Sequence, residues 1–255
     1  MFELREVWFS YGRETVLKGI NLKLKEGERV VLLGGNGCGK STLLKLMDGL
    51  LFAEKGKVLW KGRELTPSGL RKMEEEFRRS VALLFQDVEV MLFNPTVEDE
   101  IAFGPRQLNL QDVEERVKKW GNKLGIKPLF KRSPAELSIG EKKKVALASV
   151  LVLEPEVLLL DEPLSNLDPR STGEVIDLLW ELHITTVVAT QNLSLAAELG
   201  ERAVLLSEEH RIIYDGDFEG LFLNRDLLLQ ANLLHLHRHR HGRLLHSHFH
   251  PHDWE

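Results

Sequence analysis

Cysteine is almost absent from this sequence, and that limits what can hold the fold together. Of 255 residues only Cys38 carries a thiol, so the chain can form no internal disulfide framework. Such a chain suits a reducing compartment, and we expect a protein of the cytosol. Because 43% of the residues are hydrophobic, the chain can instead bury a core of ordinary size.

Long apolar runs are also missing. No stretch reaches the roughly 18 apolar residues that a membrane-spanning helix needs, and the longest candidate, 145–160, is interrupted at Ser149 and at 154–156. The N-terminal segment MFELREVWFS lacks the basic and apolar regions of a signal peptide. We therefore expect a soluble chain that reaches a membrane only through a partner.

An excess of positive charge is missing as well. The formal net charge is −5 with histidine neutral, whereas proteins whose main partner is nucleic acid usually present a basic face. The composition therefore argues against nucleic acid as the main partner.

Strand and helix patterns alternate along most of the chain. Alternation of this kind predicts a parallel α/β sheet, and the apolar run at 157–160 suits a strand that is buried on both faces. The helical stretch at about 87–153 predicts an inserted helical subdomain, and two strands at the N-terminus predict an antiparallel β subdomain. The expected strands are 2–9, 16–24, 28–33, 57–60, 81–85, 157–160, 185–190 and 203–207, and the expected helices include 40–50, 111–124, 141–153, 170–182 and 193–199.

A glycine-rich segment joins the expected strand 28–33 to the helix that begins at Lys40. It fits the pattern G-x-x-x-x-G-K-[ST] of a phosphate-binding loop. Glycines let backbone N–H groups turn inward around phosphate oxygens, and the helix start adds its positive end. Lys40 would reach the β- and γ-phosphates, and the Ser41 hydroxyl would bind Mg²⁺. A glycine turn without a ligand is the alternative, which the flanking strand and helix disfavour. The expected nucleotide contacts are Gly34, Asn36, Gly37, Cys38, Gly39, Lys40, Ser41 and Thr42. We also expect the loop position to lower the pKa of the Cys38 thiol.

Two acidic residues follow the apolar strand at 157–160. Asp161 suits a ligand of Mg²⁺, and Glu162 suits the residue that polarises an attacking water. The alternative is a pair of strand-end acids that face solvent. The phosphate loop alone does not separate kinases, GTPases and transport ATPases, and the acidic pair narrows that choice.

With both motifs in hand, residues 1–231 resemble the nucleotide-binding subunits of ATP-binding-cassette (ABC) transporters, which have the P-loop NTPase fold. Residues 137–141, Leu-Ser-Ile-Gly-Glu, resemble the family signature LSGGQ, with Ile139 and Glu141 departing from it. In that family the signature serine and glycine close over ATP held by a second subunit. The resemblance thus implies that Ser138 and Gly140 contact nucleotide, and a helix N-cap at Ser138 is the other reading.

Further positions match the family one by one. The resemblance implies that Tyr11 stacks on adenine, and the alternative for Tyr11 is a core aromatic at the end of a strand. The resemblance also implies that Gln86 senses Mg²⁺ and the attacking water. Asp168 falls in the loop that crosses the dimer interface. Gln191 stands where the family has a switch histidine. Glutamine can donate a hydrogen bond but cannot titrate, so we expect hydrolysis to be slowed rather than absent. The implied catalytic residues are Glu162, Gln191 and Gln86, and the implied Mg²⁺ ligands are Ser41, Gln86 and Asp161.

The stretch 87–105 resembles the subunits of metal and vitamin importers of the energy-coupling type, and the histidine-rich tail favours the cobalt and nickel importer ATPases among them. The resemblance implies a subunit on the cytoplasmic face of the membrane, with integral membrane transporter subunits and a second cassette subunit, most simply an identical one, as partners. Alternatives are the ATPase of a vitamin-type energy-coupling importer, a weakly catalytic regulatory subunit, and a soluble cassette protein acting on DNA or ribosomes. The single cassette without a long coiled-coil insertion disfavours the last.

A histidine-rich tail, 232–255, follows the cassette. Histidines two residues apart share one face of an extended chain, and two such rows could fold back on one ion. Neutral imidazole suits Zn²⁺, Ni²⁺, Co²⁺ and Cu²⁺, so the tail favours a transition metal as cargo. An engineered tag and a functionless polar tail are the alternatives, and we expect the tail to be disordered without metal. The candidate ligands are His235, His237, His239, His241, His246, His248, His250 and His252.

Overall fold

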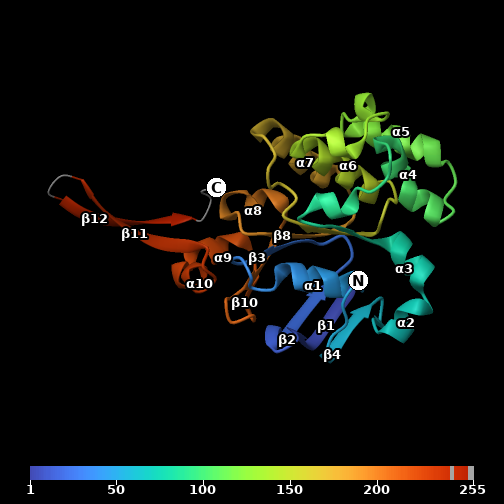
Figure 1. Cartoon of the computed structure of the whole chain (residues 1–255). Helices are drawn as coiled ribbons and strands as arrows, with labels where there is room; N and C mark the ends of the chain where they lie inside the picture. Colours follow the sequence, from blue (N-terminus) through green and yellow to red (C-terminus); the bar gives the residue numbers. More distant parts are fainter. Residues whose placement is uncertain (242–243, 252–255) are drawn as a thin grey trace. The chain divides into compact units, whose positions relative to one another are not determined.

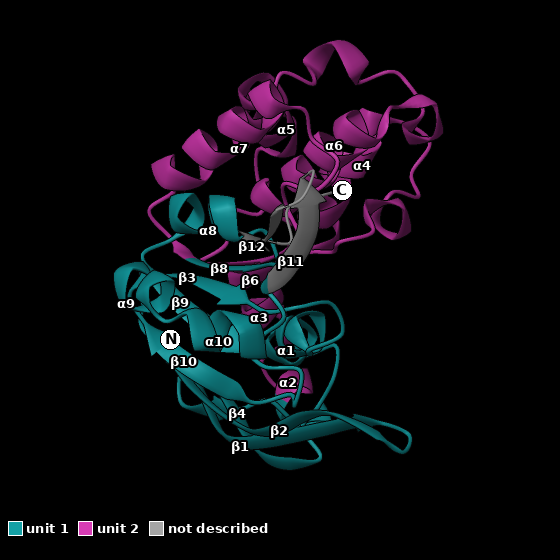
Figure 2. Ribbon diagram, turned by 90° about the vertical axis from the view of Figure 1, so that its left-hand side faces the viewer, with its two compact units in different colours: residues 1–69, 186–255 teal, residues 70–185 magenta. Residues whose placement is uncertain are grey.

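The computed structural model describes the backbone of residues 1–241 and 244–251 and the side chains of residues 1–234. The chain forms two compact units (Figures 1 and 2). Unit 1 contains residues 1–69 and 186–255, and unit 2 contains residues 70–185. Unit 2 is therefore an insertion in the sequence of unit 1.

Unit 1 begins with the predicted antiparallel sheet. The strand β1 (Phe2–Tyr11) lies between β2 (Glu14–Leu24) and β4 (Lys55–Trp60), and β5 (Arg63–Glu64) forms the edge beside β4. A register shift at Glu6, which has a φ of 48°, moves the buried face of β1 from Phe2 and Leu4 to Val7 and Phe9. A bulge of this kind changes which alternate residues face the core.

A mainly parallel set of strands forms the second part of unit 1. The strand β3 (Arg29–Leu33) pairs in parallel with β8 (Thr185–Thr190) and β9 (Arg202–Leu206), and β10 (Ile212–Gly216) runs antiparallel beside β9. Residues 30–33 are fully buried, as expected for a parallel strand covered on both faces. The helices of unit 1 are α1 (Lys40–Met47), α8 (Leu193–Leu199), α9 (Phe218–Leu223) and α10 (Arg225–Gln230).

Unit 2 pairs β6 (Val81–Leu84) in parallel with β7 (Val157–Asp161), and every residue of both strands is buried. The α/β class with a helical insertion agrees with the prediction. Unit 2 is wider than the predicted subdomain 87–153, because it also includes both strands and α7. Its helices are α2 (Pro67–Arg71, across the unit boundary), α3 (Glu74–Ser80), η1 (Val88–Met91), α4 (Val97–Gln107), α5 (Val113–Lys123), η2 (Lys127–Leu129), η3 (Pro134–Glu136), α6 (Ile139–Leu151) and α7 (Pro169–Glu181).

The tail differs from the prediction of disorder. The backbone of β11 (Leu234–His241) pairs antiparallel with β12 (Leu244–Pro251) to form a hairpin. The expectation of disorder was wrong because it rested on polarity alone, whereas the strict alternation of residue types along the tail has the period of a β-strand.

Candidate functional site

The phosphate loop, residues 34–41, connects the buried strand β3 to α1, and its glycines are required by close contacts. Gly34 and Gly39 have φ values of 152° and 111°. A Cβ at Gly34 would lie 2.6 Å from the Cys38 Sγ and from the Leu206 carbonyl oxygen, and one at Gly39 would lie 2.5 Å from the Val16 carbonyl oxygen. No other residue fits at either position without moving backbone, so the glycines of the motif shape this loop.

Lys40 turns its ammonium back onto the loop. Its Nζ donates hydrogen bonds to the carbonyl oxygens of Gly34, at 2.6 Å, and Gly35, at 3.0 Å, and the side chain is buried. The first turn of α1 carries no acidic residue, and its N-cap, Gly39, supplies no side-chain hydrogen bond. A cation beside a helix start without a side-chain cap is suited to phosphate, because the N–H groups of the first turn need an acceptor. Ser41 is half-buried and Thr42 is buried on this turn, whereas Asn36 and Gly37 are exposed.

Cys38 departs from the prediction. It is only 1% exposed, and burial raises the pKa of its thiol, against the opposing effect of the Lys40 ammonium. The nearby cation and the helix start favour a lower pKa, whereas the desolvation of a thiolate raises the pKa and has the larger effect here. Cys38 therefore packs inside the loop as a neutral thiol.

A main-chain hydrogen bond joins the phosphate loop to the root of the histidine hairpin. The N–H of Gly35 donates to the carbonyl oxygen of Ala231, at 2.9 Å. Ala231 and Leu233 are fully buried, and Asn232 between them has a φ of 54°. Nothing in the sequence indicated this link, because the partners lie far apart in the chain.

Gln191 follows β8 at the same sheet edge as the phosphate loop. Thr190, the last residue of β8, is opposite Leu33, the last residue of β3. Because β3 and β8 are parallel, the residues that follow them lie at one edge, where α/β proteins bind ligands. The structure thus brings the half-buried Gln191 close to the loop that carries Lys40.

Tyr11 ends β1 with its side chain 48% exposed and makes an edge-to-face contact with Phe9, with ring centroids 5.0 Å apart. The alternative of a core aromatic is wrong, because half of the side chain faces solvent. An exposed ring can stack on a planar ligand.

Unit 2 places its acidic pair and Gln86 at one edge. Leu84 is opposite Leu160 in the parallel pair, so Gln86 and the pair Asp161 and Glu162 follow strand ends that lie side by side. Asp161 is 4% exposed, Glu162 is half-buried with a φ of 45°, and Gln86 is exposed. Buried and partly buried carboxylates with a nearby amide oxygen form a donor set that suits Mg²⁺.

Ser138 does cap a helix, as the alternative interpretation held. Its Oγ accepts a hydrogen bond from the N–H of Glu141, and the Glu141 carboxylate accepts from the Ser138 N–H, at 2.8 Å, and Oγ–H, at 2.9 Å. These bonds to Ser138 lower the pKa of Glu141. The departure of this sequence from LSGGQ at Glu141 thus creates a reciprocal capping box. Ile139 is 57% exposed, and a Cβ at Gly140 would have no neighbour nearer than 3.8 Å.

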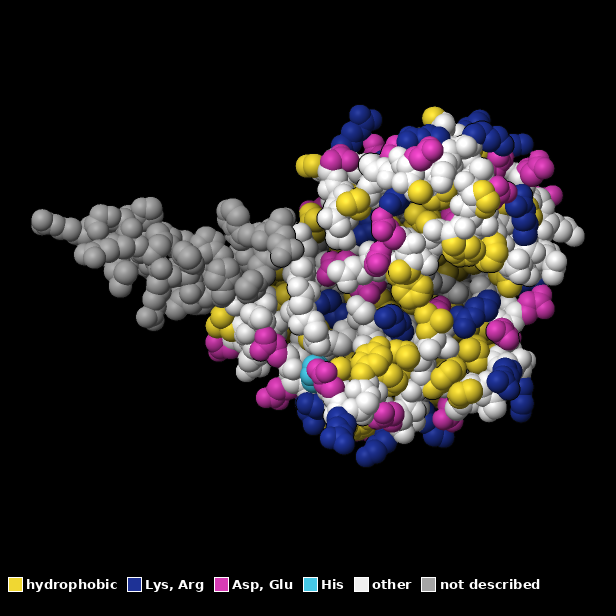
Figure 3. Space-filling view, in the orientation of Figure 1, with side chains coloured by type: hydrophobic (Ala, Val, Ile, Leu, Met, Phe, Trp, Pro, Cys, Tyr) yellow, Lys and Arg dark blue, Asp and Glu magenta, His cyan; other side chains and the backbone are white. Residues whose placement is uncertain are grey.

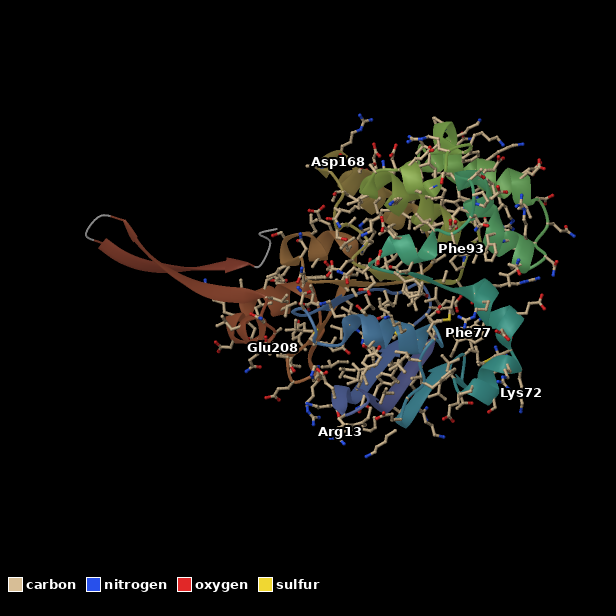
Figure 4. All side chains as sticks on the ribbon, viewed as in Figure 1. Arg13, Lys72, Phe77, Phe93, Asp168 and Glu208 are labelled. Atoms are coloured by element: carbon tan, nitrogen blue, oxygen red, sulfur yellow. The ribbon has the colours of Figure 1, made fainter. Side chains whose placement is uncertain are left out.

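Asp168, labelled in Figure 4, caps the next helix of unit 2. Its carboxylate accepts from the N–H groups of Arg170, at 3.1 Å, and Ser171, at 3.0 Å, and hydrogen bonding with Ser171 lowers its pKa. Asp168 and Glu141 both line a hollow of about 720 Å³ bounded by α5 and α7. The structure therefore brings the predicted interface residue Asp168 and Glu141, the cap of the signature helix, to one cavity, whereas Ser138 and Gly140 do not line it.

The comparison with known proteins decides the family. Residues 17–165 match the family described as ABC transporter.

The chain belongs to the ABC transporter family.

This cassette is 42% identical over 244 residues to the nickel import ATP-binding protein NikO of Rhodobacter capsulatus, with 91% of this chain and 95% of that one covered. It is 38% identical over 237 residues to the energy-coupling factor transporter ATP-binding protein EcfA of Methanocaldococcus jannaschii, with coverages of 91% and 84%. The solved structure of cbiO1 from Clostridium perfringens, part of the ABC transporter complex cbiONQ, superposes with a TM-score of 0.75 at 33% identity, covering 91% and 94%. The cassette is therefore an ATPase that uses ATP and Mg²⁺.

Two further findings bear on the membrane and the tail. No helix within the described part of the chain is long and apolar enough to cross a bilayer. For the tail the structure describes backbone pairing only, and His252 lies outside the described residues. In that pairing, positions 235, 237 and 239 are opposite positions 250, 248 and 246, so histidine pairs with histidine three times in register, whereas His241 is opposite Leu244.

Proposed function

We propose that this cassette powers a membrane importer of cobalt or nickel ions. The observation that carries the proposal is the attachment of two histidine rows, paired in register, to a cassette that is 42% identical to a nickel import ATP-binding protein. Imidazole is a ligand for these ions. The tail would bind metal without taking part in catalysis.

In the proposed cycle each unit has its own task. In unit 1, Lys40 and the loop N–H groups would hold the phosphates, Tyr11 would stack on adenine, Gln191 would donate a hydrogen bond to the γ-phosphate, and Ser41 would be a ligand of Mg²⁺. In unit 2, Asp161 and Gln86 would be ligands of Mg²⁺. Glu162 polarises the attacking water. The burial of Asp161 and Lys40 and the exposure of Tyr11 support these assignments.

We assign the partner contacts to unit 2. Ser138, Gly140 and Asp168 would close over ATP held by a second copy of the cassette, with which this chain forms a dimer. All three stand at exposed or half-exposed helix starts, as a closing surface requires.

The membrane subunits would contact an apolar patch formed by Val90, Phe93 and Phe103. Their side chains are 67%, 65% and 38% exposed, and the two rings meet edge to face with centroids 4.9 Å apart. Figure 3 shows hydrophobic side chains gathered where Figure 4 labels Phe93. Exposed aromatic groups of this kind mark interaction surfaces. The cassette would thereby sit on the cytoplasmic face of the membrane as a peripheral subunit.

The turnover of ATP tests the motor role against a regulatory one. The purified chain should hydrolyse ATP in the presence of Mg²⁺, and Glu162→Gln should lower kcat by at least about 100-fold, as the loss of a group that acts in the transition state does. A parent chain that turns over no faster than Glu162→Gln would instead indicate the weakly catalytic subunit.

Calorimetric titration tests the metal cargo against a vitamin. The intact chain and a truncation after Leu234 are titrated with Ni²⁺, Co²⁺ and Zn²⁺. The intact chain should bind metal more tightly, and binding should weaken as the pH falls through about 6.5, because protons compete for imidazole. Equal uptake by the two chains would remove the tail from the argument and favour the vitamin-type importer, to which the similarity to EcfA also points.

A further inference from the structure

Lys143 is a buried lysine in the second turn of α6, and no sequence motif singles it out. It is 3% exposed. Its Nζ donates to the carbonyl oxygen of Glu162 at 2.6 Å, to the Ser165 Oγ at 2.6 Å, and to the Ser165 carbonyl oxygen at 3.3 Å. An ammonium has three donors, so this arrangement gives each of them an acceptor on one short turn.

The turn that Lys143 holds, residues 162–165, carries the proposed catalytic carboxylate. Glu162 has a φ of 45°, a left-handed conformation that is strained for a residue with a side chain and persists where surrounding bonds fix it. Its carbonyl oxygen accepts from the Ser165 Oγ–H at 2.9 Å and the Ser165 N–H at 3.3 Å, besides Lys143. The contacts on this one carbonyl fix the backbone from which the Glu162 side chain leaves.

Burying the ammonium of Lys143 costs free energy, and the neighbouring lysines of α6 are less buried and have ion-pair partners. Burial lowers the pKa of Lys143 to about 8, while the carboxylates of Glu162 and Asp161 favour its charged form. Lys142 instead forms an ion pair with Glu89 of η1. Lys144 forms one with Glu174 of α7 at 3.0 Å. A buried ammonium is weak evidence for stability, because an apolar side chain of similar volume often stabilises as well or better. The position of Lys143 therefore calls for a role beyond packing.

We infer that Lys143 is a positioning residue for ATP hydrolysis: it fixes the backbone of Glu162 and thereby the aim of its carboxylate. The inference rests on the proposed role of Glu162. Because α6 begins at the capping residue Ser138, Lys143 also ties the helix of the signature segment to the turn of the catalytic acid. A small shift of a reacting group can cost about 100-fold in rate.

The test is a double-mutant cycle on the full chain, read out as kcat and KM for ATP. Lys143→Met keeps the length of the side chain and removes its donors, so kcat should fall about 10- to 100-fold with KM nearly unchanged. Lys143→Arg keeps donors and charge and should recover part of kcat. Lys142→Met and Lys144→Met remove the two flanking charges, which are partly buried but form their ion pairs outside residues 162–165, and serve as matched controls, with kcat within about twofold of the parent.

The decisive comparison is made in the Glu162→Gln background. There Lys143→Met should cause no further loss, because the carboxylate that it positions is already gone. Two outcomes would overturn the inference and leave the proposed role of Glu162 intact. The first is an equal loss of kcat from Lys143→Met in both backgrounds. The second is a parental kcat for Lys143→Met when Glu162→Gln is slow. A parental rate for Glu162→Gln would overturn the proposed role of Glu162 and the inference with it. If Lys143→Met does not fold, Ser165→Ala removes one acceptor of the same network and should give a smaller fall in kcat, again absent in the Glu162→Gln background.

Discussion

Gln191 is the residue at which we expect a single side-chain change to alter the rate of ATP hydrolysis most directly. It lies beside the phosphate loop, since Thr190 is opposite Leu33. A histidine there can donate a hydrogen bond and carry charge as the transition state forms, whereas glutamine can donate but cannot carry charge. We expect Gln191→His to raise kcat by about tenfold, within the range that one well-placed donor contributes, and to change KM little. Steady-state kinetics at pH 7 measure both, and an unchanged or lower kcat would show a site rebuilt around glutamine.

Cys38 allows a second prediction at the residue scale, which follows from the raised pKa of its buried thiol. A thiol that is 1% exposed and whose pKa is raised by burial is mostly protonated at neutral pH, and only the thiolate is nucleophilic. Iodoacetamide should therefore modify the folded chain far more slowly than the chain in denaturant. Mass spectrometry follows the rate, and bound ATP should change it little. Rapid alkylation of the folded chain that ATP blocks would show that the loop opens to expose Cys38.

The helix α6 depends on its first turn, where Ser138 and Glu141 cap each other. Glu141→Ala should lower the free energy of unfolding at pH 7 by about 1 kcal/mol, as the loss of a cap does. The bonds from Ser138 lower the pKa of Glu141, so the carboxylate stabilises the fold above its ordinary pKa and loses that effect as the pH falls through the lowered value. Urea unfolding at pH 7 and at about pH 3 should show the difference from the parent closing at the acid end. A difference that persists in acid would mean that packing, rather than the ionised cap, was lost.

The bounds of several helices and strands could be predicted from the sequence. Strand β8 and helix α8 have the predicted bounds, and β3, α6 and α7 begin within two residues of the prediction, because each is an apolar run or a periodic pattern with a local start signal. The short elements β10, α9 and α10 were not predicted. Their strand and helix patterns are brief, and packing within unit 1 decides them more than local preference does.

The residues of the candidate site also separate into those with a local signal in the sequence and those placed by distant contacts. The phosphate loop could be predicted because its chemistry is contained in one contiguous segment, whereas the contacts of Gly34 with Leu206 and of Gly39 with Val16 lie outside that segment and could not. Lys143 could not be predicted, because its acceptors lie on Glu162 and Ser165, about 20 residues along the chain. The pKa of Cys38 was predicted with the wrong sign, because burial cannot be read from the neighbours of a residue in sequence.

At the scale of the whole molecule, the apolar patch of Val90, Phe93 and Phe103 is the surface that we propose for contact with the membrane subunits. Phe93→Ser should reduce the recovery of membrane subunits with the tagged cassette by about tenfold, because exposed aromatics at the centre of an interface carry much of its binding energy. Leu223→Ser, at an 80% exposed position of unit 1 outside the patch, is the matched control. Co-purification from detergent extracts measures the effect, and unchanged melting temperatures exclude unfolding. Equal recovery with both variants would place the membrane contact elsewhere.

The bond between Gly35 and Ala231 also determines where this chain can be altered. The hydrogen bond of 2.9 Å fixes the backbone at the root of the tail to the loop that holds Lys40. A fusion or a cut beyond residue 234 leaves this anchor intact, whereas a cut before residue 231 removes the acceptor and leaves a buried N–H of the loop unsatisfied, at a cost of about 1–3 kcal/mol. Fusions and cuts beyond residue 234 should therefore be tolerated, whereas changes to the buried residues Ala231 and Leu233 should disturb the phosphate loop.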